Sequence, residues 1–178
     1  MAIGRELAAR GVVSRLAIDF LVTRAGPDAA WESRAIEINL RMGGTTHPFL
    51  ALQFLTGGRI DEETGLFHSP RGNEKFYFST DSLKSPLYRG LLPEDLMEIV
   101  TTHGLHFQPS TERGILFHMI GGLSQFGKVG VTCFANDPEE ADSLYRHTVD
   151  VMDRETGAKG RSRGKMIELF DGSLPTME

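Results

Sequence analysis

The chain has 178 residues, of which 40% are hydrophobic and 24% charged, an ordinary composition for a globular protein with one good core or one core plus a small appendage. The net charge of −5, from 19 basic and 24 acidic residues, disfavours nucleic acid or an anionic membrane as the main partner. A single cysteine, Cys133, excludes an internal disulfide and favours a reducing, cytoplasmic compartment. The sequence also lacks an apolar run of the ~20 residues that a membrane span needs, and it lacks the features of a signal peptide.

Turn and capping signals divide the chain into short strands and helices, and they predict an α+β fold. Gly11, Gly57 and Gly104 each follow a helical pattern and mark its end. In chain order we expect a helix over residues 2–10, strands over 12–22 and 34–41, a helix over 48–56, a loop over 60–73, a strand over 75–80, a helix over 92–103, strands over 115–120 and 128–135, and a helix over 136–155.

The last predicted helix has the clearest start signal. Asp137 is placed to cap it, Pro138 occupies the first helical position and Glu140 the third, which is a capping-box pattern. Beyond this helix the apolar periodicity fades, and the segment containing GAKGRSRGK predicts a flexible, solvated tail over residues 157–178.

Polar side chains share one face of the first two predicted strands. Strand side chains alternate between faces, so Asp19 lies opposite its apolar neighbours, and Glu37, Asn39 and Arg41 do the same on the second strand. The turn between the strands is long enough to make them antiparallel neighbours, with the three metal-suited groups converging on one face. The apolar residues expected to bury together on the other face are Ile18, Phe20, Ile36, Ile38 and Leu40.

This polar face suits a metal–phosphate site. Two carboxylates and an amide oxygen, from Asp19, Glu37 and Asn39, are hard ligands that fit Mg²⁺ or Mn²⁺. Arg41 supplies a positive fork for a phosphate or carboxylate, and the Gly43, Gly44, Thr45, Thr46 loop can bring N–H groups and hydroxyls close to an anion. The alternative is an edge hairpin with one solvated polar face.

These residues resemble a known family. AIDF followed by IEINLRMGGTTHP is similar to the metal-binding end of the ATP-grasp carboxylate–amine ligases, in which an acid on one strand precedes Glu-x-Asn on the next. The same stretch, with HGLHF and VGVTCFANDPEEADSLYR further on, is most similar to the pheganomycin-type peptide ligase branch with its C-terminal domain. The resemblance covers roughly residues 2–155. One extra residue separates Arg41 from His47-Pro48 relative to biotin carboxylases, so substrate contacts are not transferred from those enzymes.

The resemblance implies ATP and Mg²⁺ (or Mn²⁺) as cofactors and an amino acid or peptide as the carboxylate and amine substrates. It implies that Asp19, Glu37 and Asn39 ligate the metal and that Glu37 is shared between two ions. Arg41 would face the transferred phosphoryl group or the acyl-phosphate, and residues 43–46 would approach phosphates or a substrate carboxylate. The implied fold is the C-terminal part of an ATP-grasp domain over residues 1–58, with a small α/β C-terminal domain over 59–156.

An upstream half is expected as well. Only 18 residues precede Asp19, and no glycine-rich phosphate loop with a lysine lies among them, since the first lysine is Lys75. We therefore expect a partner region in cis or in trans that carries the nucleotide-binding half, and expect the chain alone to be inactive. The alternative is a non-catalytic binding or assembly module. A homo-oligomer is compatible with either.

Other candidate sites are weaker. The six histidines lack the cysteine cluster or helical spacing of a zinc site. His118 shares a strand face with apolar residues and is expected to be a hydrogen-bonded core or interface histidine. Cys133 is expected to be a small buried strand residue rather than a nucleophile. The aromatic run over residues 76–78 lacks the interleaved basic residues of a base-stacking surface and favours strand core.

Overall fold

The structure is a computed structural model that describes residues 2–13 and 15–170. It confirms the mixed α+β class, with small antiparallel sheets and five α-helices in the described part of the chain. The chain divides into two compact units, unit 1 and unit 2, with the boundary between Ala51 and Leu52. The two units are described separately.

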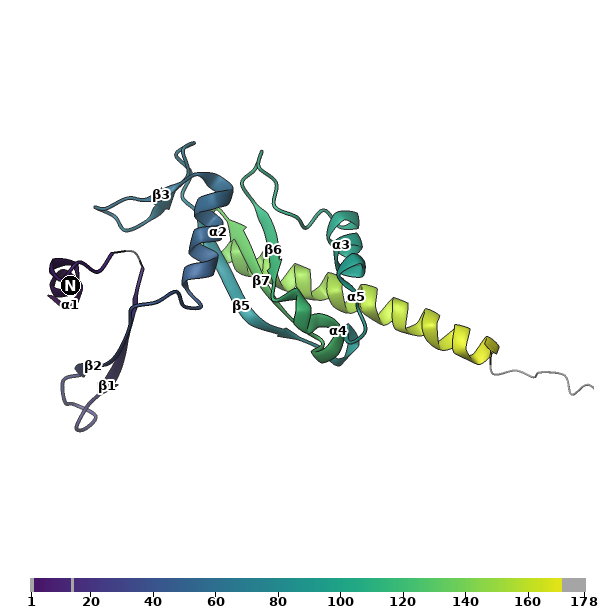
Figure 1. Cartoon of the computed structure of the whole chain (residues 1–178), viewed down its shortest axis with the longest axis horizontal. Helices are drawn as coiled ribbons and strands as arrows, with labels where there is room; N and C mark the ends of the chain where they lie inside the picture. Colours follow the sequence, from purple (N-terminus) through teal and green to yellow (C-terminus); the bar gives the residue numbers. More distant parts are fainter. Residues whose placement is uncertain (1, 14, 171–178) are drawn as a thin grey trace, which may run out of the picture. The chain divides into compact units, whose positions relative to one another are not determined.

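Unit 1 contains helix α1 (Ala2–Ala9), strands β1 (Ala17–Thr23) and β2 (Glu32–Asn39), and the first turns of helix α2 (Thr46–Thr56) (Figure 1). Gly11 ends α1 at a φ of 83°, as its position predicted. The N–H groups of Gly11 and Val12 donate to carbonyls of the last helical turn at 3.0 Å, so Val12 belongs to the helix end. For this reason β1 begins later than the predicted strand.

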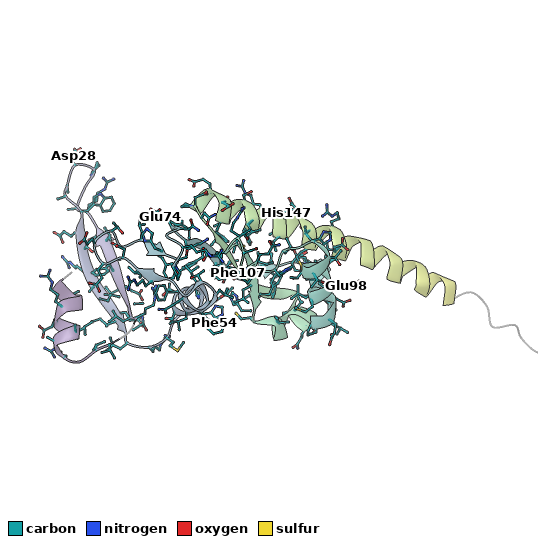
Figure 2. All side chains as sticks on the ribbon, turned by 90° about the horizontal axis from the view of Figure 1, so that it is seen from above. Asp28, Phe54, Glu74, Glu98, Phe107 and His147 are labelled. Carbon is teal, nitrogen blue, oxygen red and sulfur yellow. The ribbon has the colours of Figure 1, made fainter. Side chains whose placement is uncertain are left out.

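The β1–β2 hairpin does not bury its apolar face, and that prediction was wrong. Phe20, Ile36 and Ile38 are 50%, 64% and 45% exposed. Side chains on one face of a two-stranded sheet stand side by side, so a hairpin needs another layer to exclude water from that face. No described element of unit 1 supplies that layer. The turn tip carries Asp28 (Figure 2).

Helix α2 ends at Thr56, followed by Gly57 at a φ of 68°, as predicted. The following segment is not all loop, contrary to prediction. Strands β3 (Arg59–Ile60) and β4 (Phe67–His68) pair antiparallel, with Arg59 opposite His68. The turn between them is closed by Asp61, whose Oδ1 accepts hydrogen bonds from the N–H groups of Glu63 and Thr64. This local turn lets two very short strands pair.

The centre of unit 2 is an antiparallel three-stranded sheet in the order β5-β7-β6, with β5 at Phe76–Lys84, β6 at Gly114–His118 and β7 at Lys128–Ala135. The bounds of β7 match the prediction. Strand β5 runs further than predicted, because a register shift between Thr80 and Leu83 allows pairing to resume beyond it. Residues 129–135 of β7 are all buried, so both faces of the central strand are covered.

Helices α3 (Pro93–Thr102), α4 (Leu123–Phe126) and α5 (Pro138–Phe170) complete unit 2, with single 3₁₀ turns at Pro86–Tyr88 and Ile120–Gly122. The start of α5 is capped as predicted, since Glu140 N–H donates to Asp137 Oδ1 at 2.6 Å; the returning bond comes from Asn136 N–H to Glu140 Oε2 at 2.9 Å. Figure 1 shows α5 running along the sheet. Helical backbone continues to Phe170, past the predicted start of a flexible tail, and the rest of that tail lies outside the described residues.

The core of unit 2 forms where α5 packs on β5 and β7. Phe78 stacks on Tyr145 with ring centroids 4.5 Å apart, and Phe107 meets Phe134 edge-on at 5.9 Å. Cys133 is fully buried in β7, as predicted, and burial raises the pKa of its thiol to about 12. His118 is hydrogen-bonded, as predicted, with its Nε2 2.8 Å from Asp81 Oδ1.

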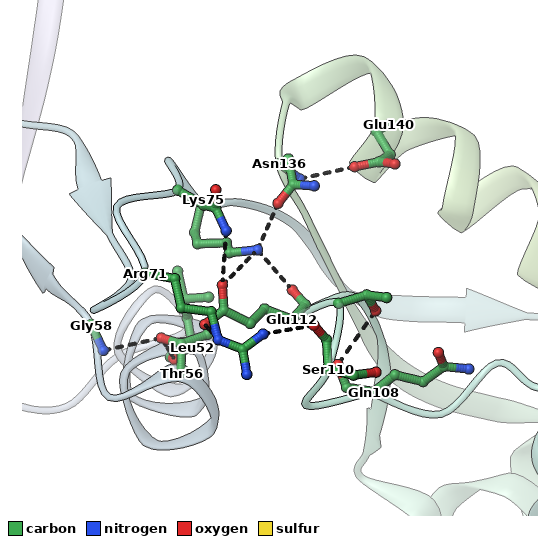
Figure 3. Close-up of polar contacts among 12 residues, drawn as sticks. Leu52, Thr56, Gly58, Arg71, Lys75, Gln108, Ser110, Glu112, Asn136 and Glu140 are labelled. Carbon is green, nitrogen blue, oxygen red and sulfur yellow. Dashed lines mark hydrogen bonds and ion pairs between the residues drawn. The ribbon is translucent and has the colours of Figure 1, made fainter.

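A buried ion pair joins three separate segments of unit 2 (Figure 3). The Lys75 side chain is fully buried, and its Nζ lies 3.2 Å from Glu112 Oε2, 3.2 Å from the Glu112 carbonyl oxygen and 2.6 Å from Asn136 Oδ1. Glu112 adopts a left-handed backbone conformation with a φ of 54°, which is uncommon for a residue with a side chain. Lys75 thus holds the start of β5, the loop before β6 and the residue after β7 together.

Replacing Lys75 should strongly destabilise unit 2. In Lys75→Met the Glu112 carboxylate loses its buried cationic partner and keeps only the half-exposed Arg71, 3.7 Å away, as an ion-pair partner in the described residues. Removal of one member of a buried pair costs about 3–5 kcal/mol. Urea unfolding followed by far-ultraviolet circular dichroism measures the change. Lys84→Met on the exposed end of the same strand is the control and should change stability by less than about 0.5 kcal/mol. Equal stability of the two variants would contradict a structural role for the pair.

Glu112 should also make stability depend on acid pH. Burial by itself raises the pKa of Glu112, but the neighbouring Ser69 hydroxyl, Lys75 and Asn73 stabilise its carboxylate and bring the pKa below its ordinary value of 4.5. The folded pKa is lower than the unfolded one, so this stabilisation is present above pH 4.5 and is lost as the pH falls through the folded pKa. Stability of Glu112→Gln should therefore fall less than that of the natural chain between pH 6 and 3; an identical pH dependence would refute the assignment.

Candidate functional site

The register of β1 and β2 brings the predicted carboxylates together. Asp19 pairs directly with Glu37, and Ala17 pairs with Asn39 two residues along. Directly opposite residues of an antiparallel pair point to the same face with Cβ atoms about 5 Å apart. Asp19, Glu37 and Asn39 therefore share one face of the hairpin, while the Ile18–Ile38 pair takes the other.

A β-bulge directly after the Asp19–Glu37 pair interrupts the regular pairing of the two strands. The register shifts between Asp19 and Phe20, so Phe20 pairs with Ala35 and Ile36 has no partner in β1. A bulge bends a strand and increases its twist, and bulges are frequent beside functional sites. Alternation between faces, as predicted from the sequence, therefore holds for residues 37–39 but is interrupted at Ile36.

Six of the predicted site residues line one pocket of about 280 Å³ in unit 1. Leu16, just before β1, and Ala17, its first residue, also line this pocket. Arg41 lies just beyond the end of β2, with an exposed side chain whose Nη1 donates only a long 3.3 Å bond to the Met42 carbonyl oxygen. The predicted residues that line the pocket are Asn39, Arg41, Gly43, Gly44, Thr45 and Thr46.

The loop before α2 is closed by its own hydrogen bonds. Gly43 N–H donates to Thr46 Oγ1 at 3.1 Å, and Thr46 N–H donates to the Gly43 carbonyl oxygen at 2.9 Å. Thr46 is buried, and its hydroxyl holds the loop against the start of α2 through the bond from Gly43 N–H. Nearby, the Arg15 guanidinium lies 3.9 Å from the centre of the Phe49 ring, which attaches the segment before β1 to α2.

The fold of the chain itself does not require glycine at Gly43 or Gly44. Neither has a positive φ, and a Cβ added at either position would meet no atom within 4 Å. In contrast, a Cβ at Gly114 would lie 2.4 Å from the His106 carbonyl oxygen. Space is therefore free beside both glycines, which line the pocket, and a bound group could approach the backbone closely there.

The donor set fits part of a magnesium shell. Two facing carboxylates and an amide oxygen are hard ligands, and Mg²⁺ commonly takes only one or two protein carboxylates, with water and phosphate oxygens completing its shell. Within the described residues no group of three or more His, Cys, Asp or Glu side chains could hold a metal. A closed all-protein cage is therefore not present in that part of the chain, and a metal would depend on oxygens from a second molecule.

Sequence reasoning did not find two features of unit 2. The first is the buried Lys75–Glu112 pair, which has no local signal because the two residues are 37 apart in the chain. The second is a pocket formed by β3 and β4, because the segment was predicted to be loop. A polar turn residue such as Asp61 between short apolar stretches was the only available indication.

Residues 95–148, which include α3, β6, β7 and the start of α5, match the family of the PGM1 C-terminal domain. The resemblance to the pheganomycin-type peptide ligases predicted from the sequence is thereby confirmed. The matched segment lies entirely in unit 2 and contains two of the three strands of its central sheet.

The similarity extends beyond this domain. Over 143 residues, 80% of this chain, the sequence is 29% identical to the L-propargylglycine–L-glutamate ligase of Streptantibioticus cattleyicolor. The chain spans about 28% of the length of that relative. No solved structure matches the chain significantly.

Among the described residues, none of the helices combines the length and the apolar character that crossing a bilayer requires.

The free space at Gly44 leads to a prediction about stability. Gly44→Ala should change the free energy of unfolding of unit 1 by less than about 0.5 kcal/mol, since the new methyl group meets no atom. Gly11→Ala is the matched control and should cost about 1–2 kcal/mol, because its φ is 83°. Urea unfolding followed by far-ultraviolet circular dichroism measures the change. A large loss in Gly44→Ala would mean that the glycine serves the fold.

Proposed function

We propose that this chain is the C-terminal part of an ATP-dependent carboxylate–amine ligase of the ATP-grasp type, which forms a peptide bond through an acyl-phosphate. The observation that carries this proposal is the convergence in unit 1. Asn39, Arg41 and the 43–46 loop line one pocket, and the facing carboxylates of Asp19 and Glu37 share a strand face with Asn39. Similarity to an amino-acid ligase over 80% of the chain supports it.

Each residue has a role in this proposal. Asp19, Glu37 and Asn39 hold magnesium, which when bound neutralises the charge of the ATP phosphates. The open backbone at Gly43 and Gly44 and the Thr45 hydroxyl approach a phosphate or a substrate carboxylate. Arg41 faces the transferred phosphoryl group, where its planar fork can bind two oxygens at once.

The proposed reaction has two steps. An oxygen of the substrate carboxylate attacks the γ-phosphorus of ATP, and the bond to the β–γ bridging oxygen breaks to release ADP. The amine of the second substrate then attacks the acyl carbon, phosphate leaves, and the amine loses a proton to give the amide. Both steps develop negative charge on phosphate oxygens, which Arg41 is placed to stabilise.

The exposed apolar face of the hairpin supports a missing upstream half. Phe20, Ile36 and Ile38 are each at least 45% exposed, and contiguous apolar surface of this kind marks an interaction site. We propose that this face contacts the nucleotide-binding half of the ligase, supplied in cis or in trans.

We also propose that the ATP-grasp part of this chain ends near residue 58 and that the C-terminal domain begins at 59. A non-catalytic assembly module that retains the same fold is the alternative.

Catalysis distinguishes the two candidates. Without the upstream half the chain should not release ADP from Mg-ATP and amino acids, because phosphoryl transfer requires the whole nucleotide to be positioned. With that half joined or added, ADP release should appear, and Glu37→Gln should abolish it. Arg41→Lys should reduce kcat, since lysine cannot reproduce the planar fork, with the thermal midpoint unchanged.

The matched control is Arg34→Lys, at an exposed position within β2 where the arginine pairs with Glu32 at 2.8 Å. This variant should retain the natural turnover. Natural turnover in Arg41→Lys would exclude Arg41 from catalysis. No ADP release by the completed protein, with the chain folded and the two halves associated, would favour the assembly module.

A further inference from the structure

A second pocket, of about 480 Å³, lies wholly in unit 2 and shares no residue with the first. It is formed between the end of α2 and the β3–β4 hairpin. Its volume is within the range of small-molecule sites, which is about 300–1,000 Å³. The lining residues are Gly57, Gly58, Arg59, Asp61, His68, Ser69, Pro70 and Gly72.

Two opposite charges stand on the same wall of this pocket. Arg59 and Asp61 both line it, whereas Ile60 between them does not, as the alternation of side chains along an extended chain requires. Two residues of a strand span about 6.6 Å. Arg59 is exposed and forms no ion pair with any residue that the structure describes. Its guanidinium is therefore available to an anionic group.

Asp61 is held in its charged form. The Thr64 N–H, at 2.8 Å from Oδ1, is the main cause of a lowered pKa at Asp61, and the Thr64 hydroxyl at 3.0 Å and the Glu63 N–H at 3.0 Å lower it further. These bonds use Oδ1 and fix the carboxylate in the turn. The second oxygen of Asp61 is left to face a cationic group.

Ser69 and Gly58 are part of the lining beside these two charges. The Ser69 hydroxyl oxygen is shielded from solvent and lies close enough to Glu112 to lower the pKa of that carboxyl, so it serves the fold. A Cβ at Gly58 would lie 2.4 Å from the His68 carbonyl oxygen, so the residue before β3 lies close against the backbone of β4. The charged groups on which a ligand would depend are therefore those of Arg59 and Asp61.

We propose that this pocket binds a free α-amino acid as its zwitterion. The carboxylate of the ligand pairs with Arg59, while its ammonium group pairs with Asp61. A phosphate or other simple anion is repelled by Asp61, and a metal cation is repelled by Arg59. A peptide separates its ammonium and carboxylate by at least one peptide unit, whereas a free amino acid carries both on one carbon. The short form suits Arg59 and Asp61, whose positions are about 6.6 Å apart along the extended chain.

This site does not rest on the proposed ligase activity, because binding to unit 2 needs neither ATP nor the residues of unit 1. The two proposals are nevertheless compatible, since an amino acid is a substrate class of the proposed reaction. If the completed protein released no ADP, amino-acid binding in this pocket could still be observed. If no amino acid bound, the proposed metal–phosphate site in unit 1 would be unaffected.

Titration of the ¹⁵N-labelled chain with L-alanine and with L-glutamate, followed by backbone amide shifts, tests the proposal. Saturable shifts should centre on Gly57, Gly58 and Gly72. L-alanine amide and N-acetyl-L-alanine each lack one charge and should bind at least about tenfold more weakly, because each loses a charge-assisted hydrogen bond. Alanyl-alanine should also bind more weakly. Equal binding of all four alanine compounds, or shifts centred outside this pocket, would overturn the proposal.

Two variants locate the charges. Arg59→Gln should weaken L-alanine binding at least about tenfold by removing the partner of the carboxylate. Asp61→Asn should do the same, and it keeps an acceptor for the Thr64 N–H so that the turn is preserved. Glu62→Gln is the control, an exposed neighbour in the same turn that does not line the pocket. Natural affinity in both pocket variants, or absence of any saturable binding, would rule the site out.

Discussion

The pairing of β1 with β2 determines what unit 1 can do. Because Asp19 stands directly opposite Glu37, two negative charges share one face with no cation between them in the register. Like charges opposite each other destabilise a strand pair, so this arrangement is costly unless a cation neutralises it. In the same register Ala17 and Asn39 both line the pocket, and the other face is left apolar and exposed. One local pairing therefore accounts for both the proposed site and the exposed apolar face.

The sequence was informative where a local signal determines local structure. The cap at Asp137 and the ends of α1, α2 and α3 were predicted from single residues, because capping depends on neighbours within one turn. The shared face of Asp19, Glu37 and Asn39 was predicted from strand alternation, which also needs only neighbours. The 43–46 loop was predicted to lie beside them from its place after the strand and from its residue types. The roles of these residues toward metal and phosphate stay predictions.

The misses have a common physical cause, which is dependence on distant partners. Burial of the hairpin face was predicted from its pattern, but a pattern states which side is apolar and not whether a layer covers it. Strands β3 and β4 have two residues each, too few for any periodicity, and they form because Asp61 closes the turn. Lys75 and Glu112 meet across 37 positions, a contact that only the folded sheet creates.

The single thiol of the chain has a practical consequence. Cys133 is enclosed in the central strand, and a thiol with a pKa near 12 is almost entirely protonated at neutral pH and therefore a poor nucleophile. Maleimide reagents should leave it unmodified while the fold is intact. A cysteine placed at the exposed hairpin tip, in the position of Asp28, would then carry a fluorophore or spin label alone, without first removing the natural residue. The motion of the hairpin could be followed in this way in an otherwise unaltered chain.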